Sequence, residues 1–222
     1  MKHQRVTIVV FGLRTYLGRE IARFGRAMGH RIVAVVDAIP EFDAPWMHGI
    51  HWTRAEAADF DSPFSIPPKA VVYCDTALWD GGRGRFREVL FERPRHLLRD
   101  ISSWDHPPRF VYRSTPPQSL LPSGFTAYAR RMEAEIARCS LSSLILRLPL
   151  LYGPDRPDSV AAMMIAESLH RLPLDSIASY TPATMRVETA ALAALRGCLE
   201  PNMEGILEPE DVARIGDVMI PQ

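Results

Sequence analysis

The segment that decides the fold is RVTIVVFGLRTYLG, residues 5–18. Its first half, up to Phe11, is rich in Val and Ile and predicts a buried strand, which Gly12 ends at a turn. Apolar residues then recur at three- and four-residue steps, which predicts a helix capped by Gly29. A second apolar run covers Ile32–Val36. The first part of the chain therefore forms a strand–helix–strand unit with two parallel strands.

The alternation of strand and helix patterns continues along the chain. Further short strands are expected at residues 50–53, 70–74, 109–113 and 143–148. The sequence thus predicts an α/β fold, a doubly wound parallel sheet with a small C-terminal cap. In the cap we expect helices at Ser159–Leu172 and Val187–Leu199, whereas the tail from Glu210 is weakly patterned. The predicted division is a main domain over 1–154 and a small substrate or cap region over 155–222 that partly returns to it.

Composition excludes several classes of protein. A chain of 222 residues suits one domain with a small appendage. Its 26 basic and 26 acidic residues balance, so no net charge attracts nucleic acid or anionic lipid. No apolar run is long enough for a membrane-spanning helix, and the N-terminal run continues into a glycine turn rather than a leader cleavage site. The 3 cysteines and 7 histidines lack metal or disulfide spacing, so we expect no metal site and a reducing, cytoplasmic location.

Lysine is nearly absent. Lys2 and Lys69 are the only lysines, so all other basic residues of the chain are arginines. The sequence after Lys69 therefore excludes any mechanism that needs a lysine amine in the second half of the chain.

The turn after the first strand has the residues of a dinucleotide site. It reads Gly12-Leu13-Arg14-Thr15-Tyr16-Leu17-Gly18, and Asp37 follows after the second strand. Glycines let backbone N–H groups approach a pyrophosphate, and the helix N-terminus adds partial positive charge. An acid after the second strand can hold a ribose diol. The alternative is a strand-to-helix turn that uses its two glycines for geometry alone.

This loop resembles the G-x-x-G-x-x-G loop of the extended and atypical short-chain dehydrogenase/reductases, the NAD-dependent epimerase/dehydratase group, with Thr15 at the middle position. Other segments resemble that family in the same order along the chain. They are Gly49–Trp52 for the third strand, Val71–Ala77 for the fourth strand that backs the cofactor, Phe110–Thr115 for the strand with the catalytic Ser or Thr, Tyr128 with Glu133-Ala134-Glu135 for the Y-x-x-x-K helix, and Leu146–Pro154 for the sixth-strand motif.

The resemblance implies an NAD(P)-binding Rossmann fold and a set of site residues. Arg14 and Arg19 suit the 2′-phosphate of NADP, whereas Asp37 suits the ribose of NAD, and the expectation leans to NAD. The implied cofactor-binding residues are Gly12, Arg14, Thr15, Tyr16, Leu17, Gly18, Asp37, Cys74, Asp75, Thr76 and Pro149. The implied catalytic residues are Tyr128, Ser114 and Thr115.

The chain departs from the family at the lysine that follows the tyrosine by four residues, which here is Met132. In the family that lysine lowers the pKa of the proton-exchanging tyrosine, by about 1–3 units for a close cation. Methionine carries no charge. Arg131, three residues after Tyr128, is the alternative cation. Met132 also fits an apolar stripe with Ile136 and Cys139 that faces the sheet.

Two functions stay open at this point. The first is an NAD(P)-binding protein with absent or altered oxidoreductase chemistry, acting, if it is an enzyme, on a nucleotide sugar or a small carbonyl compound. The second is a non-catalytic scaffold, a redox-sensing regulator or an accessory subunit that uses the same fold. The resemblance also implies a homodimer or a larger protein complex, because members of the family often pair through helices across a two-fold axis.

Overall fold

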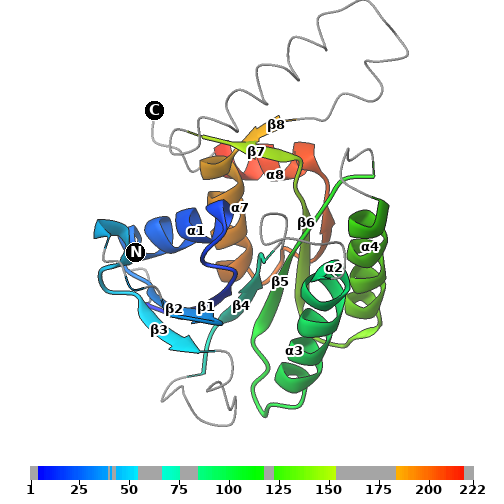
Figure 1. The fold of residues 1–222 in the computed structure, drawn as a ribbon, viewed down its shortest axis with the longest axis horizontal. Coiled ribbons are helices and arrows are strands. Elements are labelled where there is room, and N and C mark those ends of the chain that lie inside the picture. The colour runs from blue at the N-terminus through cyan, green and yellow to red at the C-terminus, as the bar shows by residue number, and fades with distance from the viewer. Residues whose placement is uncertain are drawn as a thin grey trace, which may run out of the picture.

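The computed structural model describes residues 5–39, 41, 44–54, 67–75, 85–117, 123–153 and 184–217. Their main feature is a seven-stranded parallel sheet in the order β3-β2-β1-β4-β5-β6-β9 (Figure 1). Its strands are β1 (Thr7–Phe11), β2 (Arg31–Val36), β3 (His51–Arg54), β4 (Ala70–Tyr73), β5 (Arg109–Ser114), β6 (Ser143–Arg147) and β9 (Gly205–Leu207). Two short strands, β7 (Leu150–Tyr152) and β8 (Thr184–Arg186), pair in a separate parallel sheet.

The order of the strands confirms the doubly wound parallel sheet. From β1 the chain runs outward to β2 and β3, and it then returns beside β1 at β4 and continues in the other direction. The direction changes between β1 and β4. In open sheets of this kind, ligands bind outside the carboxyl ends of the strands at this switch point.

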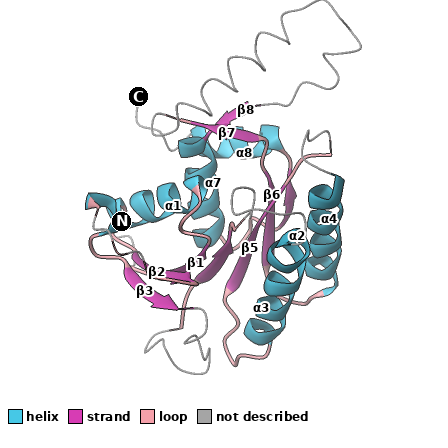
Figure 2. Cartoon of the chain, in the orientation of Figure 1, coloured by secondary structure: helices cyan, strands magenta, loops and turns pink. Residues whose placement is uncertain are grey.

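Helices cover both faces of the large sheet (Figures 1 and 2). One face packs against α1 (Tyr16–Ala27), α7 (Val187–Leu199) and α8 (Pro209–Asp217). The other face packs against η3 (Glu88–Glu92), α3 (Arg93–Ser102) and α4 (Ser123–Arg138). Two short helical segments complete the described elements, α2 (Arg85–Arg87) and η1 (Pro45–Met47). Both faces bury apolar side chains, because Ile8 and Val10 of β1 face α1 and Val9 faces the opposite layer.

Most predicted elements are present within one residue of their expected bounds. Gly29 follows α1 with φ +85°, the conformation that a helix-ending glycine supplies, and the predicted helix Val187–Leu199 is α7.

The sequence pattern does not predict β9 or α8. Three residues at a sheet edge, with Ile206 exposed, are too few for a readable period. The expected helix Ser159–Leu172 lies outside the described residues, and the domain boundary after residue 154 stays a prediction.

The helix that contains Pro94 widens into a π-turn, η3, directly before the proline. Proline lacks an N–H and crowds the carbonyl four residues earlier, which is that of Leu90. The neighbouring strands supply the missing donors. Tyr112 of β5 donates its hydroxyl to the Leu90 carbonyl at 3.0 Å, and Tyr73 of β4 donates to the Val89 carbonyl at 2.6 Å. The two buried tyrosines therefore hold the π-turn that precedes Pro94.

Candidate dinucleotide and anion site

The glycine turn after β1 lies at the switch point of the sheet. Gly12 has φ +88°, and a Cβ at this residue would lie 2.4 Å from the backbone nitrogen of Asp75, just after β4. A Cβ at Gly18 would lie 2.3 Å from the Gly12 carbonyl oxygen. Both glycines are therefore required by close packing within the chain, with or without a ligand. Their presence alone does not prove a dinucleotide site.

Thr15 turns its side chain into the loop instead of toward a ligand. Its hydroxyl donates to the Gly12 carbonyl at 2.7 Å and accepts from the Gly18 N–H at 3.1 Å, so Thr15 is the N-cap of α1. The hydroxyl also lies 3.8 Å from the Cys74 sulfur. The threonine in the family's middle-glycine position therefore stabilises the start of α1.

The other loop residues divide into buried and exposed ones. Tyr16 and Leu17 are buried, and a Cβ at Gly153 would lie 2.0 Å from the Tyr16 hydroxyl, so the ring packs on the backbone beyond β7. Arg14 is exposed, whereas the Arg19 guanidinium lies 5.9 Å from the centre of the Tyr16 ring. Of the cations that flank the loop, Arg14 is thus the exposed one. Pro149 is buried just after β6.

Asp37, directly after β2, forms an ion pair with an arginine. One guanidinium nitrogen of Arg93, at the start of α3, lies 3.1 Å from each carboxylate oxygen of Asp37. Arg93 also donates to Glu88 at 2.9 Å. A ribose that approaches Asp37 therefore meets an acid and an arginine side by side. The sequence pattern could not show this, because the two residues are 56 positions apart.

Cys74 and Asp75 directly follow β4, at the carboxyl edge of the sheet. The Cys74 sulfur donates to the Phe11 carbonyl at 3.1 Å, and burial raises the pKa of this thiol to about 12. Its side chain therefore points into the core and is a neutral thiol. Asp75 is partly buried. Thr76, the next predicted site residue, lies outside the described residues.

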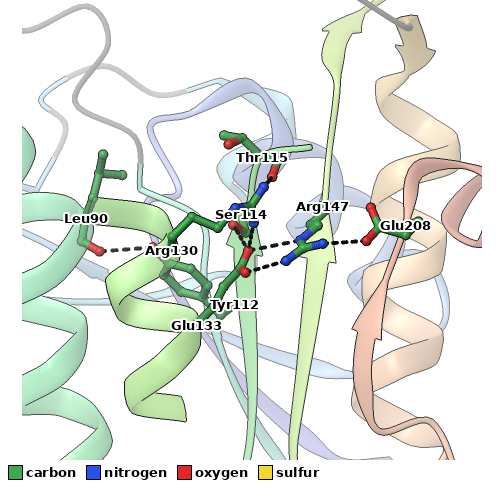
Figure 3. Close-up of polar contacts among 8 residues, drawn as sticks. All are labelled: Leu90, Tyr112, Ser114, Thr115, Arg130, Glu133, Arg147 and Glu208. Carbon is green, nitrogen blue, oxygen red and sulfur yellow. Dashed lines mark hydrogen bonds and ion pairs between the residues drawn. The ribbon is translucent and has the colours of Figure 1, made fainter. Parts of the chain in front are cut away.

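An ionic network around the buried carboxylate of Glu133 joins the ends of β5 and β6 to α4 (Figure 3). The carboxylate of Glu133 accepts from Ser114, from Arg130 and from Arg147, whose Nη2 lies 2.7 Å away. Arg147 also donates to Glu208, just before α8. Burial alone would raise the pKa of Glu133, but hydrogen bonds from Arg147 and Ser114 outweigh it, so the pKa lies below its usual value.

Ser114 and Thr115 have different surroundings, although both were candidate catalytic residues. The Ser114 hydroxyl is buried and donates to Glu133. The Thr115 hydroxyl is also buried, but it has no hydrogen-bond partner among the described residues, while its carbonyl accepts from Arg130 at 2.6 Å. Of the two, Thr115 is therefore the residue whose hydroxyl lacks a partner within the described part of the chain.

Tyr128 lies on a different flank of α4 from the network. It precedes Glu133 by five residues, which separates the two side chains by about 140° at 3.6 residues per turn. The Arg131 guanidinium lies 5.7 Å from the Tyr128 ring centre and 4.3 Å from that of Phe91. The contacts of Tyr128 and those of Ser114 thus lie on different flanks of the helix. Arg131 does lie beside Tyr128, as the sequence spacing suggested.

Met132 is fully buried against the sheet, in the same cluster as Ile136 and Cys139. The predicted apolar stripe is therefore present. Among the described residues, no group of three His, Cys, Asp or Glu side chains is placed to hold a metal ion. Within the same residues, no helix has the length and apolar character needed to cross a bilayer.

Sequence reasoning missed the charged partners that these contacts reveal. Glu133 and Arg147 lie in two separate segments that resemble family motifs, and only the fold shows that they form one ion pair. Nothing in the sequence distinguishes Arg93 and Arg113 from the other arginines of this arginine-rich chain.

Searches with the sequence found no matching family model and no matching curated protein. Solved structures do match in fold. WbmG of Bordetella bronchiseptica, crystallised with NAD, has a TM-score of 0.69 at 14% identity, over 98% of this chain and 78% of that one. Human epimerase family protein SDR39U1 with NADPH has a TM-score of 0.62 at 16% identity, over 91% and 73%. Vestitone reductase from alfalfa (Medicago sativa) has a TM-score of 0.62 at 13% identity, over 92% and 76%. This chain has the fold that these proteins share.

Proposed function

We propose that this protein binds NAD or NADP at the carboxyl edge of the sheet, around the ends of β1, β2 and β4. The observation that supports this most is the position of Gly12. It lies at the switch point, the N-terminus of α1 follows within one turn, and an acid stands at the end of β2. A helix N-terminus favours a pyrophosphate, and an acid in that place favours a ribose. NAD and NADPH in structures of the same fold add support.

The residues present suit such a group. Gly12 and Gly18 keep the turn tight against the end of β4, and Asp37 with Arg93 would meet the adenosine ribose. The chemistry that a nicotinamide supplies when bound is hydride transfer. At the end of β5, the Thr115 hydroxyl has no partner among the described residues and would hold the oxygen of a nucleotide sugar or a small carbonyl compound.

We further propose that the family's tyrosine–lysine proton transfer does not operate here. No lysine follows Lys69, and Met132 is fully buried. Tyr128 lies about 140° around α4 from Glu133. Any oxidoreductase chemistry in this chain must therefore use another proton donor, or the dinucleotide is bound without turnover.

Titration with NADH and NADPH, followed by the fluorescence of the reduced nicotinamide, tests the proposal. We expect saturable binding with a Kd below about 1 mM. Asp37→Ala should change the affinity, whereas the matched variant Asp105→Ala should not, because exposed Asp105 precedes β5 at the opposite edge of the sheet. Absence of binding to either dinucleotide at millimolar concentration would disprove the proposed function.

A non-catalytic module is the second candidate, and the Ser114–Glu133 contact favours it. A hydroxyl that donates its proton to a buried carboxylate cannot donate it to a substrate. A panel of ketones and nucleotide sugars, assayed with bound dinucleotide, separates the two candidates. Turnover that is lost in Thr115→Val indicates an enzyme. Binding without turnover of any substrate in the panel supports a scaffold, regulator or accessory subunit.

The three cysteines are free, and two of them are buried. Free thiols support a reducing compartment, so the cytoplasm is the proposed location. A homodimer or a larger complex also remains part of the proposal.

A further inference from the structure

Arg113 occupies a central place at the carboxyl edge of the sheet. It is the last residue but one of β5, and the register of β4 with β5, Val72 with Val111 and Tyr73 with Tyr112, brings Arg113 opposite Cys74. Along β5, Arg113 shares a face with Val111, which packs in the α1 layer. This arginine therefore lies on the same side of the sheet as the glycine turn.

The Nε of Arg113 is buried and lacks a hydrogen-bond partner among the described residues. The side chain as a whole is partly buried, and no described residue forms an ion pair with it. The other arginines at this edge differ from it. Arg93 contacts Asp37 and Glu88, while Arg130 and Arg147 share Glu133.

A partly buried cation whose Nε lacks a hydrogen-bond partner is costly. Burial lowers the pKa of Arg113, although a guanidinium with so high an ordinary pKa stays protonated at neutral pH. Of its titratable neighbours, Cys74 and Tyr112 are neutral at pH 7 because burial raises their pKa values, and the negative charge of Asp75 acts to raise the pKa of Arg113. The charge is thus held in place without a hydrogen-bonded counterion from the described chain.

A second unsatisfied group lies two residues further along. The Thr115 hydroxyl is buried and lacks a partner among the described residues. In an extended chain, residues two apart project from the same side. A guanidinium that offers several N–H donors and a hydroxyl that offers one form a donor set suited to the oxygens of a phosphate or carboxylate.

We propose that Arg113, together with Thr115, is the receptor for an oxyanion, a phosphate or carboxylate group of the ligand, at the end of β5. The proposal rests on the proposed function for the place of the site, and it adds the chemistry of the ligand recognised there. The anion belongs either to the dinucleotide or to a separate acidic substrate.

Thermal unfolding of the full chain without dinucleotide, at constant ionic strength, tests the receptor itself. The probes are inorganic phosphate and oxalate, with sodium chloride as the reference salt. At about ten times its Kd, a bound anion should raise the Tm by about 3–5 °C. Arg113→Gln should abolish the shift, and Thr115→Val should reduce it. Arg138→Gln should retain it, because this variant removes an equal charge from the exposed end of α4.

Arg113→Gln should also raise the Tm of the anion-free protein, since it removes a partly buried charge that has no hydrogen-bonded counterion among the described residues. A purely structural arginine would give the opposite sign. A wild-type protein that shows no anion response up to about 100 mM, or an Arg113→Gln variant that keeps the full response, overturns the proposal.

NADH titrations identify the source of the anion. Competition between phosphate and NADH, with about tenfold weaker NADH binding in Arg113→Gln, indicates a phosphate of the dinucleotide. Independent binding of the two indicates a separate acidic ligand. Tighter NADH binding in Arg113→Gln would mean that the guanidinium only obstructs the site, which contradicts the proposal. The phosphate response does not depend on dinucleotide binding, so it stands or fails separately from the proposed function.

Discussion

Arg93 holds both carboxylate oxygens of Asp37 at 3.1 Å, which links the start of α3 to the end of β2. This places a donor and an acceptor at the same point of the predicted ribose site. The acid would accept from the hydroxyls of NAD, and the arginine would pair with the 2′-phosphate of NADP.

Two single substitutions should therefore shift cofactor preference in opposite directions. Asp37→Ala removes the charge that repels a 2′-phosphate and should raise the NADPH-to-NADH affinity ratio by about tenfold. Arg93→Ala should lower the same ratio by a similar factor. Fluorescence titration of each variant with both dinucleotides measures the ratio, and Arg99→Ala, exposed on the same helix, is the control. Shifts in the same direction would show that this pair does not face the ribose.

The Glu133 network should make stability depend on pH. The pKa of Glu133 is lower in the folded protein than its ordinary value near 4.3, so the network stabilises the fold above that pH. The stabilisation is lost as pH falls through the folded pKa. Glu133→Gln should cost about 2 kcal/mol at pH 7, because it removes the counterion that Arg130 and Arg147 share, although Arg147 keeps Glu208.

Urea unfolding between pH 7 and pH 3 measures this effect. The gap in unfolding free energy between wild type and Glu133→Gln should narrow below about pH 4. Glu135→Gln is the matched control. Glu135 pairs with Arg95 and with exposed Arg138, so its loss should cost less than about 1 kcal/mol. If the difference in unfolding free energy between wild type and Glu133→Gln does not change with pH, the ion pairs of Glu133 do not stabilise the fold in this way.

The contact between Tyr112 and Leu90 predicts a coupling with Pro94. Tyr112→Phe leaves a buried carbonyl without a donor and should cost about 1–2 kcal/mol. In a Pro94→Ala background the restored N–H at position 94 can serve that carbonyl, so the same substitution should cost less. Chemical unfolding of the four proteins gives the interaction energy. Additive costs would show that the tyrosine does not compensate for the proline.

The periodic helices and strands can be predicted from the sequence, whereas the contacts between charged side chains cannot. The first strand–helix–strand unit follows from local repeats in residues 5–37, and these repeats are visible without a fold. The Asp37–Arg93 and Glu133–Arg147 pairs join segments that lie 56 and 14 residues apart. With arginine so abundant, no local signal distinguishes the paired residues from those on the surface. The edge strand β9 is missed for another reason, because its three residues are too short for a period.

Met132 should not accept the lysine that the family pattern calls for. Its side chain is fully buried among Ile136, Phe110 and other apolar residues of the α4 layer. A lysine there would bury an ammonium without a partner or lose its proton, and either costs several kcal/mol. Met132→Lys should therefore unfold at a much lower urea concentration and gain no turnover with any dinucleotide and ketone. Met132→Leu, which nearly conserves volume, should cost less than about 1.5 kcal/mol. A stable Met132→Lys protein with new reductase activity would instead mean that this position faces the bound nicotinamide.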